Sequence, residues 1–284
     1  MLKKIKDKIE QRKSQLNEST KEELPSEVNF LTLPFFSLSE GDSGRKELLY
    51  REEETTWEVV PSPKYGRPGP FDKRVFKGVE QLIDDRGLPV SNPLVFTIYK
   101  LGQLMGMGSV GGDDYQRIRR SLKRLVATTI RSEGTYYLKG EKRYLDEVFH
   151  LFSRVVFKGD DLGGGKVAEA TYLFLNSWLL ANLNAGYVRP LDYDYYKSLN
   201  GQISKRLYEL LGVKFYGLLN NDGPYLRYSY KTICDLLPVK RQTYLSKAKQ
   251  ILEPAHNQLK ETDFLEGIDW QGKDPKELKL HYYP

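Results

Sequence analysis

The chain has 284 residues, of which 39% are hydrophobic and 29% charged, and its formal net charge is +6. This length suits two domains of ordinary size, and the absence of any apolar run of about 18 residues excludes an integral membrane protein. A single cysteine, Cys234, excludes an internal disulfide and a cysteine-rich zinc site, so we expect a cytoplasmic protein that does not bind membranes.

Residues 1–28 are charged and poor in aromatic side chains, and their few apolar residues are loosely spaced at a helical period. They predict a flexible or helical arm, which is either a solvated tail or a basic arm that touches DNA or a replication partner. From residue 29 the pattern changes to strand-forming residues. Phe30–Phe36, Leu48–Tyr50 and Trp57–Val60 predict either short strands or an extended lead-in packed on the first domain.

The next segment predicts two helices separated by a strand. The first helix runs from Phe71 to Asp84 and places its apolar residues on one face. Leu94–Phe96 follow as a short strand, Thr97 is expected to cap, and Ile98–Met105 form a short helix that ends at glycines.

A basic amphipathic helix is predicted over Gly111–Val126. We expect Asp113 to cap it and Gln116 to complete a capping box. One face is apolar, and the opposite face carries only Arg and Lys, with no acidic residue after Asp114. Because phosphates and guanine edges both attract Arg and Lys, this face favours a DNA-recognition helix over a merely solvated one.

Three strand-forming segments follow the basic helix, and they predict a β-hairpin wing beside it. They are Thr129–Leu138, Glu147–Phe157 and Ala168–Leu175. Residues 147–153 are apolar at alternate positions on both faces, so we expect both faces to be covered. The glycine-rich stretch near Gly163 lacks the spacing of a phosphate-binding loop and predicts a plain hairpin turn.

The C-terminal part of the chain repeats this order. Its expected elements are a helix over Gln202–Tyr216, an extended piece over Pro224–Tyr228, a helix over Tyr230–Leu237 capped by Ser229, a helix from Val239 whose apolar stripe includes Tyr244, and a hairpin of Phe264–Trp270 and Leu278–Tyr283. YKLGQLMG from Tyr99 also echoes YKTICDLL from Tyr230. We therefore predict an α+β fold of two tandem winged-helix (helix-turn-helix) domains with β-hairpin wings, over residues 29–186 and 187–284.

The two recognition helices supply the candidate DNA-binding residues. The first helix offers Gln116, Arg117, Arg119, Arg120, Lys123 and Arg124, and the opening turn of the second offers Lys240, Arg241, Gln242, Thr243 and Lys247. Arg241, Gln242 and Thr243 are side-chain types that contact base edges, so we expect the C-terminal domain to dominate the choice of sequence.

The sequence gives no sign of a catalytic centre. Its histidines, His150, His256 and His281, are scattered, and its paired aspartates lie at expected loops or helix ends. Nothing near the tyrosines would activate one as a nucleophile. We therefore expect neither an enzyme nor a cofactor or metal site.

Several stretches carry a family resemblance. The segment WEVVPSPKYGRPGPFDKRVFKGVEQLI from Trp57, with VFTIYKLGQLMG and YQRIRRSLKRLVATTI after it, resembles plasmid replication initiators of the replication initiator protein A family. LPFFSLS from Leu33 and LEPAHNQLKETDFL from Leu252 are similar too, so the likeness spans about Asn29 to Trp270.

The resemblance implies tandem winged-helix domains that bind repeated double-stranded sites at a plasmid origin, help to open the duplex and bring in the host helicase and primase machinery. It also implies a homodimer, formed through the first domain, that represses its own gene. The alternative is a winged-helix transcriptional regulator that binds a promoter, and a DNA nickase or primase is a weaker alternative.

Overall fold

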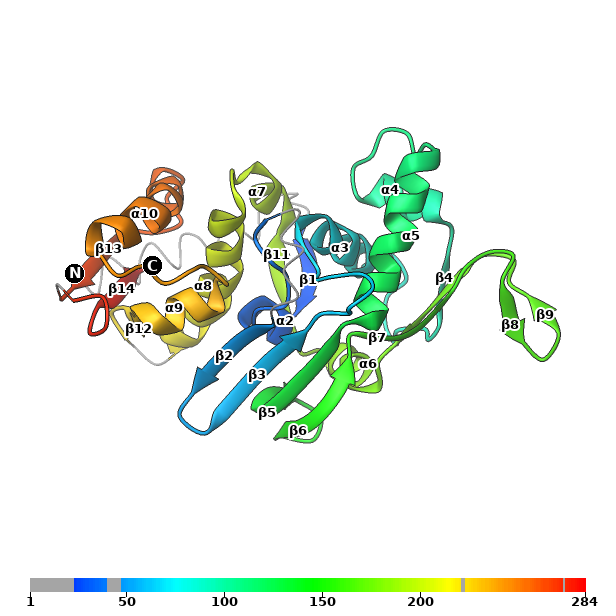
Figure 1. The fold of residues 1–284 in the computed structure, drawn as a ribbon, viewed down its shortest axis with the longest axis horizontal. Helices are drawn as coiled ribbons and strands as arrows, with labels where there is room; N and C mark the ends of the chain where they lie inside the picture. Colours follow the sequence, from blue (N-terminus) through cyan, green and yellow to red (C-terminus); the bar gives the residue numbers. More distant parts are fainter. Residues whose placement is uncertain (1–22, 40–46, 221–222, 273) are drawn as a thin grey trace. The chain divides into compact units, whose positions relative to one another are not determined.

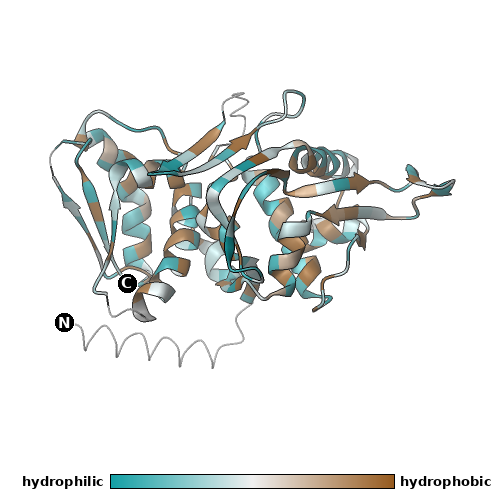
Figure 2. Cartoon of the chain, turned by 90° about the horizontal axis from the view of Figure 1, so that it is seen from below, coloured by the Kyte–Doolittle hydropathy of each residue, from teal (hydrophilic) through white to brown (hydrophobic). Residues whose placement is uncertain are grey.

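The computed structural model describes residues 23–39, 47–220, 223–272 and 274–284. They form two compact units, an N-terminal unit of residues 25–189 and a C-terminal unit that comprises residues 190–284 and the described residues 23 and 24 (Figure 1). Most of the predicted arm lies outside the described residues. Hydrophobic and hydrophilic residues alternate along the helices and strands of both units (Figure 2). No helix in the described ranges is both long and apolar enough to cross a membrane.

The N-terminal unit begins differently from the prediction. Glu23–Glu27 form strand β1, which pairs with β11 (Val188–Asp192), and Val28–Thr32 form the short helix α2. The prediction of strand or extended chain is therefore wrong for Phe30–Thr32, which are helical, and the prediction of a flexible arm reaching residue 28 is wrong as well. The cause is local, because the Glu27 carboxylate accepts the Phe30 N–H at 3.0 Å and caps α2.

A four-stranded antiparallel sheet covers one side of the N-terminal core. Its order is β2 (Leu48–Glu52), β3 (Thr55–Val60), β5 (Thr129–Leu138) and β6 (Arg143–His150). Trp57, Tyr136 and Phe149 point inward and contact one another edge-on or stacked, whereas Val148 is 66% exposed. The prediction that both faces of this segment are covered is wrong, because the outer face of the sheet is open.

The remaining elements of the N-terminal unit form a helical layer with a smaller sheet. The helices are α3 (Pro70–Asp84), α4 (Ile98–Leu104), α5 (Gly112–Ala127) and α6 (Ser177–Asn184). The sheet has the order β4 (Leu94–Phe96), β10 (Thr171–Leu175), β7 (Phe152–Val156). The predicted strand over Glu147–Phe157 divides at Leu151, where the chain passes from one sheet to the other. Only its second half therefore lies in the predicted wing, and Thr129–Leu138 belongs to the other sheet.

The connection from β7 to β10 contains a small hairpin. It consists of β8 (Asp161–Gly163) and β9 (Lys166–Val167), and in Figure 1 it projects away from the rest of the unit. Gly163, Gly164 and Gly165 all have positive φ, a backbone conformation that L side chains rarely adopt. The prediction of a hairpin turn in this stretch is confirmed.

The C-terminal unit repeats the order of the helical layer. It comprises α7 (Tyr193–Ser198), α8 (Gln202–Asn220), β12 (Leu226–Ser229), α9 (Tyr230–Leu236), α10 (Leu245–Glu261), β13 (Gly267–Gln271) and β14 (Lys279–Tyr283). Helix, strand, helix, helix and two strands recur in this order in both units, although in the N-terminal unit β5 and β6 follow α5, and β8 and β9 lie between the two strands β7 and β10. The sheets correspond as well, since β12-β14-β13 places the last strand in the centre, as β4-β10-β7 does.

The helix caps set the alignment between the repeats. Thr97 accepts the N–H of Lys100 and Ser229 accepts the N–H of Thr232, so both predicted caps are confirmed. Counting from these caps, Ile98 corresponds to Tyr230. The sequence echo that paired Tyr99 with Tyr230 is thus displaced by one residue, and Tyr99 is 51% exposed whereas Tyr230 is 3% exposed.

Candidate nucleic-acid interface

Helix α5 has the two faces that its sequence predicts. Ile118, Leu122 and Leu125 are fully buried against the N-terminal core. The capping prediction is wrong, because the N-cap is Gly111 and the carboxylate of Asp114 accepts its N–H at 3.4 Å. The helix begins before Asp113, which leaves Asp113 and Gln116 inside it and unable to cap.

Aromatic rings support the cations on the outer side of α5. Arg117 lies 3.8 Å from the ring centroid of Phe71, and Arg119 lies 4.2 Å from that of Phe157. Lys123 is 5.5 Å from the same Phe157 ring. Gln116, Arg117 and Arg120 are exposed, whereas Arg119 and Lys123 are half-buried. The predicted side chains therefore share one surface, and cation–π contacts restrict some of them without removing their charge.

Arg124 differs from the other cations of α5. Its guanidinium donates to both carboxylate oxygens of Asp72, at 2.7 and 2.9 Å, and to the carbonyl of Tyr65 at 2.7 Å. The Asp72 side chain is 3% exposed and also accepts the N–H of Gly69. Arg124 thus ties α5 to the start of α3, and we assign it a structural role in place of the predicted DNA contact.

Four residues of the second predicted set lie in a turn, and only Lys247 lies on the helix. Helix α10 begins at Leu245 with Tyr244 as its N-cap, so Lys240–Thr243 precede it. Tyr244 is 70% exposed and is absent from the apolar stripe, which Ala248, Leu252 and Leu259 form at 0% exposure. Pro254 neither breaks nor ends the helix, which continues to Glu261.

Side chains of α9 hold this turn. The backbone N–H of Gln242 donates to the Tyr230 hydroxyl at 3.1 Å, and burial raises the pKa of Tyr230 to about 12, which keeps the hydroxyl neutral. Arg241 donates to Asp235, and the Gln242 side chain donates to the Lys240 carbonyl at 3.0 Å. A helix that started at Val239 would need the Gln242 N–H for a backbone hydrogen bond within the helix. Because this N–H donates to Tyr230 instead, residues 240–243 stay in a turn.

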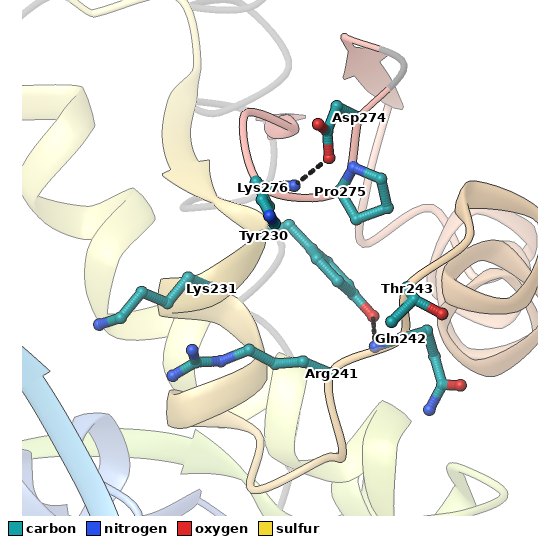
Figure 3. Close-up of a pocket in the computed structure, with 8 residues that line it drawn as sticks. All are labelled: Tyr230, Lys231, Arg241, Gln242, Thr243, Asp274, Pro275 and Lys276. Atoms are coloured by element: carbon teal, nitrogen blue, oxygen red, sulfur yellow. Dashed lines mark hydrogen bonds between the residues drawn. The ribbon is translucent and has the colours of Figure 1, made fainter.

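A pocket of about 380 Å³ opens beside the turn (Figure 3). Arg241 and Lys231 lie on one side of it, and Asp274, Pro275 and Lys276 from the β13–β14 connection lie on the other. Lys247 is exposed one turn into α10 and donates to Gln250 at 3.1 Å. Lys231 and Asp235 are not among the predicted residues, although their four-residue spacing on a helix predicts an ion pair.

Within the described part of the chain, no group of three His, Cys, Asp or Glu side chains could hold a metal ion. His256 is buried with its Nε2 3.2 Å from the Tyr282 hydroxyl, and burial lowers its pKa to about 3. Burial also raises the pKa of the Cys234 thiol to about 11. Both groups are therefore neutral parts of the C-terminal core.

The two basic surfaces, on α5 and on the α9–α10 turn, fit a protein that contacts nucleic acid, and sequence comparison gives the family. The model of the family "Replication initiator protein A" matches residues 26–215. The chain belongs to this family. The match covers the N-terminal unit of this initiator almost completely and extends through most of α8 in the C-terminal unit. No curated protein sequence matches the chain.

Solved structures resemble this initiator in fold. The crystal structure of selenomethionine derivatives of domains 2 and 3 of RctB has a TM-score of 0.51 and 12% sequence identity, and the match covers 91% of this chain and 98% of that one. A second crystal structure of RctB domains 2 and 3 has a TM-score of 0.40 and 12% identity over 84% of this chain and 90% of that one. The first likeness shows a mixed α/β fold shared along nearly the whole chain.

Proposed function

We propose that this initiator binds repeated sites in double-stranded DNA at a plasmid-type origin through two winged-helix units. One observation carries the proposal, namely the outer side of α5, where Arg117, Arg119, Arg120 and Lys123 follow one another without an acidic residue. Such a helix suits the major groove, where phosphates flank the base edges. The repeated order of elements supports a second, corresponding contact by the C-terminal unit.

The two contacts differ in character under this proposal. The four α5 cations contact phosphates along with base edges, whereas Arg241, Gln242 and Thr243 contact mainly base edges. Under the proposal, the β8–β9 hairpin and the β13–β14 connection serve as the wings of the two units. Because one chain joins both units, binding by one raises the effective concentration of the other.

We further propose that the bound initiator recruits the host helicase and primase machinery and that it also forms a homodimer. Family membership supports both parts. A winged-helix transcriptional regulator is the alternative, and the DNA beside the gene distinguishes the two. Directly repeated motifs next to an AT-rich tract favour the initiator, whereas a single palindrome over a promoter favours the regulator.

The decisive experiment is to transform a host that lacks the plasmid with the gene and its neighbouring DNA. The proposal expects that this DNA is maintained, and that a variant carrying Arg117→Ala and Arg120→Ala loses it. Equal maintenance with wild type and variant would remove α5 from the mechanism. Failure of the wild type to maintain any neighbouring DNA would favour the regulator.

The initiator acts without catalysis under this proposal, because its histidines are scattered along the sequence and its paired aspartates lie at loops or helix ends. Supercoiled origin DNA incubated with the purified protein and Mg²⁺ or Mn²⁺ should stay supercoiled. Nicking, or covalent capture of DNA on a tyrosine, would establish an enzyme instead.

A further inference from the structure

Asp235 lies at the end of α9, beside the turn that the proposed function assigns to base contacts. Its side chain is 11% exposed and its carboxylate accepts from two cations. One nitrogen of the Arg241 guanidinium, Nη2, donates to both oxygens, at 2.6 and 2.9 Å, and Lys231 Nζ lies 3.4 Å from Oδ2. The carboxylate is thus mostly covered, while the two cations remain about half exposed at 50% and 51%.

This geometry leaves part of the Arg241 guanidinium open. Nε and Nη1 have no hydrogen-bond partner among the residues that the structure describes. A guanidinium that one nitrogen holds in place can present its remaining N–H groups in a fixed direction, as bidentate recognition of a guanine edge requires. Figure 3 shows Arg241 and Lys231 extending the same way from the turn and from α9. Without a carboxylate between them, two like charges would repel each other.

We infer that Asp235 is a positioning residue that directs Arg241 toward one base and thereby sets the sequence preference of the C-terminal unit. The inference rests on the proposed function. Asp235 does not itself touch DNA, since a carboxylate facing phosphates would weaken binding. Tyr230 assists by fixing the backbone of Gln242, the residue after Arg241.

Positioning and simple electrostatics predict opposite changes in affinity for the preferred duplex when Asp235 loses its charge. Asp235→Asn removes one negative charge, so charge alone would tighten binding to every duplex equally. Positioning predicts that affinity for the preferred duplex falls relative to a scrambled one, because a released Arg241 pairs with the nearest phosphate. We define the specificity ratio as the Kd for the scrambled duplex divided by the Kd for the preferred duplex. We expect this ratio to fall about tenfold in Asp235→Asn, which is the discrimination that one bidentate contact provides.

The test uses the full chain and a duplex that the wild type enriches from a random-sequence pool, together with a scrambled duplex of equal composition. Kd is measured on both by fluorescence anisotropy for wild type, Asp235→Asn, Asp235→Ala, Arg241→Ala and the double variant Asp235→Asn with Arg241→Ala. Lys231→Ala is the matched control, because it removes the other cation on Asp235 and should leave the ratio unchanged. Circular dichroism melting identifies any variant that is unfolded at the assay temperature.

Positioning requires that Asp235→Asn lowers the ratio and has no further effect once Arg241 is absent. A ratio that stays at the wild-type value in both Asp235 variants overturns the inference and leaves the proposed function intact. The inference is also overturned if Asp235→Asn lowers the ratio by the same factor in the wild type and in Arg241→Ala, because Asp235 would then act on the fold and not on Arg241. If the wild type enriches no sequence at all, the proposed function fails and the inference fails with it.

Discussion

At the scale of single residues, a buried carboxylate organises the start of the N-terminal unit. Glu27 Oε1 accepts from the side-chain amides of Asn29 and Asn182, at 2.6 and 2.7 Å, and both amides also donate to the carbonyl of Tyr137. Glu27 therefore links β1, α2 and α6 to β5. Burial raises the pKa of Glu27 to about 7, because desolvation outweighs the donors that favour the charged form.

This raised pKa predicts a pH dependence with a definite sign. The folded protein holds the Glu27 proton up to about pH 7 and the unfolded chain only to about 4.5, so the free energy of unfolding should fall as pH rises between these values. The shift corresponds to about 3 kcal/mol. Urea denaturation from pH 5 to 8 should show this slope in wild type, and Glu27→Gln should remove it.

The wild type must be compared with Glu27→Gln because His256 changes the free energy of unfolding with pH in the opposite direction. Its pKa is lowered to about 3, so its stabilising contribution is present above the ordinary value of 6.5 and is lost as pH falls. That contribution is common to both proteins. Parallel curves for wild type and Glu27→Gln would show that Glu27 ionises in the folded protein as it does in the unfolded chain.

Arg124 and Arg120 lie one turn apart on α5 and should behave oppositely. Arg124→Ala leaves the buried Asp72 without its ion-pair partner and should lower the free energy of unfolding by about 3 kcal/mol. Arg120 is exposed, so Arg120→Ala should change stability by less than about 0.5 kcal/mol and weaken DNA binding. Thermal melting and anisotropy on both variants test this pair. Equal stability of the two would contradict the structural role of Arg124.

At the scale of elements, the repeated layer presents different surfaces in its two copies. In the N-terminal unit the cations stand on α5 and rest on Phe71 and Phe157. In the C-terminal unit most of the candidate polar residues precede the corresponding helix α10 and occupy a turn held by Tyr230 and Asp235. A regular helix spreads its cations along a groove, whereas a short braced turn places a few side chains in fixed positions. The division of roles between the units follows from this difference.

Two substitutions test this division. Arg241→Ala should cost roughly 1 to 3 kcal/mol of binding free energy on the preferred duplex and flatten the preference at one base. Lys123→Ala should weaken preferred and scrambled duplexes alike. Anisotropy titrations on single-base variants of the preferred duplex distinguish these effects. If Arg241→Ala weakened all duplexes equally while Arg117→Ala relaxed specificity, the N-terminal unit would be the main determinant of sequence.

At the scale of the whole molecule, the candidate cations belong to two units joined by one chain. With Arg124 set aside, they are Arg117, Arg119, Arg120, Lys123, Lys240, Arg241 and Lys247. Each cation that neutralises a phosphate releases a condensed counterion, so both units together should give a plot of log K against log salt concentration with a slope of about −6.

Anisotropy titrations from low to moderate salt measure this slope. The variant with Arg117→Ala and Arg120→Ala should make it shallower by about 2, because two phosphate contacts are lost. A wild-type slope shallower than about −2 would show that one unit alone, or neither, engages the DNA.

The sequence by itself determined the elements whose signals are local. Thr97 and Ser229 cap helices through their own hydroxyls, and the apolar spacing on α5 fixes which side is buried, so these features were predictable. The same local patterns suffice to identify the recurrence of helix, strand, helix and helix and the basic side of α5. A family resemblance in the residues from Trp57 onward agrees with the family match.

Tertiary structure alone decided the features that depend on distant partners. Strand Thr129–Leu138 joins β3, whose residues lie some seventy positions earlier, and no pattern within the strand indicates that choice. Arg124 resembles Arg120 in sequence, yet Asp72 on another helix captures it. The late start of α10 depends on Tyr230 and Asp235 of α9. In each case a hydrogen bond to another element outweighs a local preference of a fraction of a kcal/mol, which is why periodicity cannot detect it.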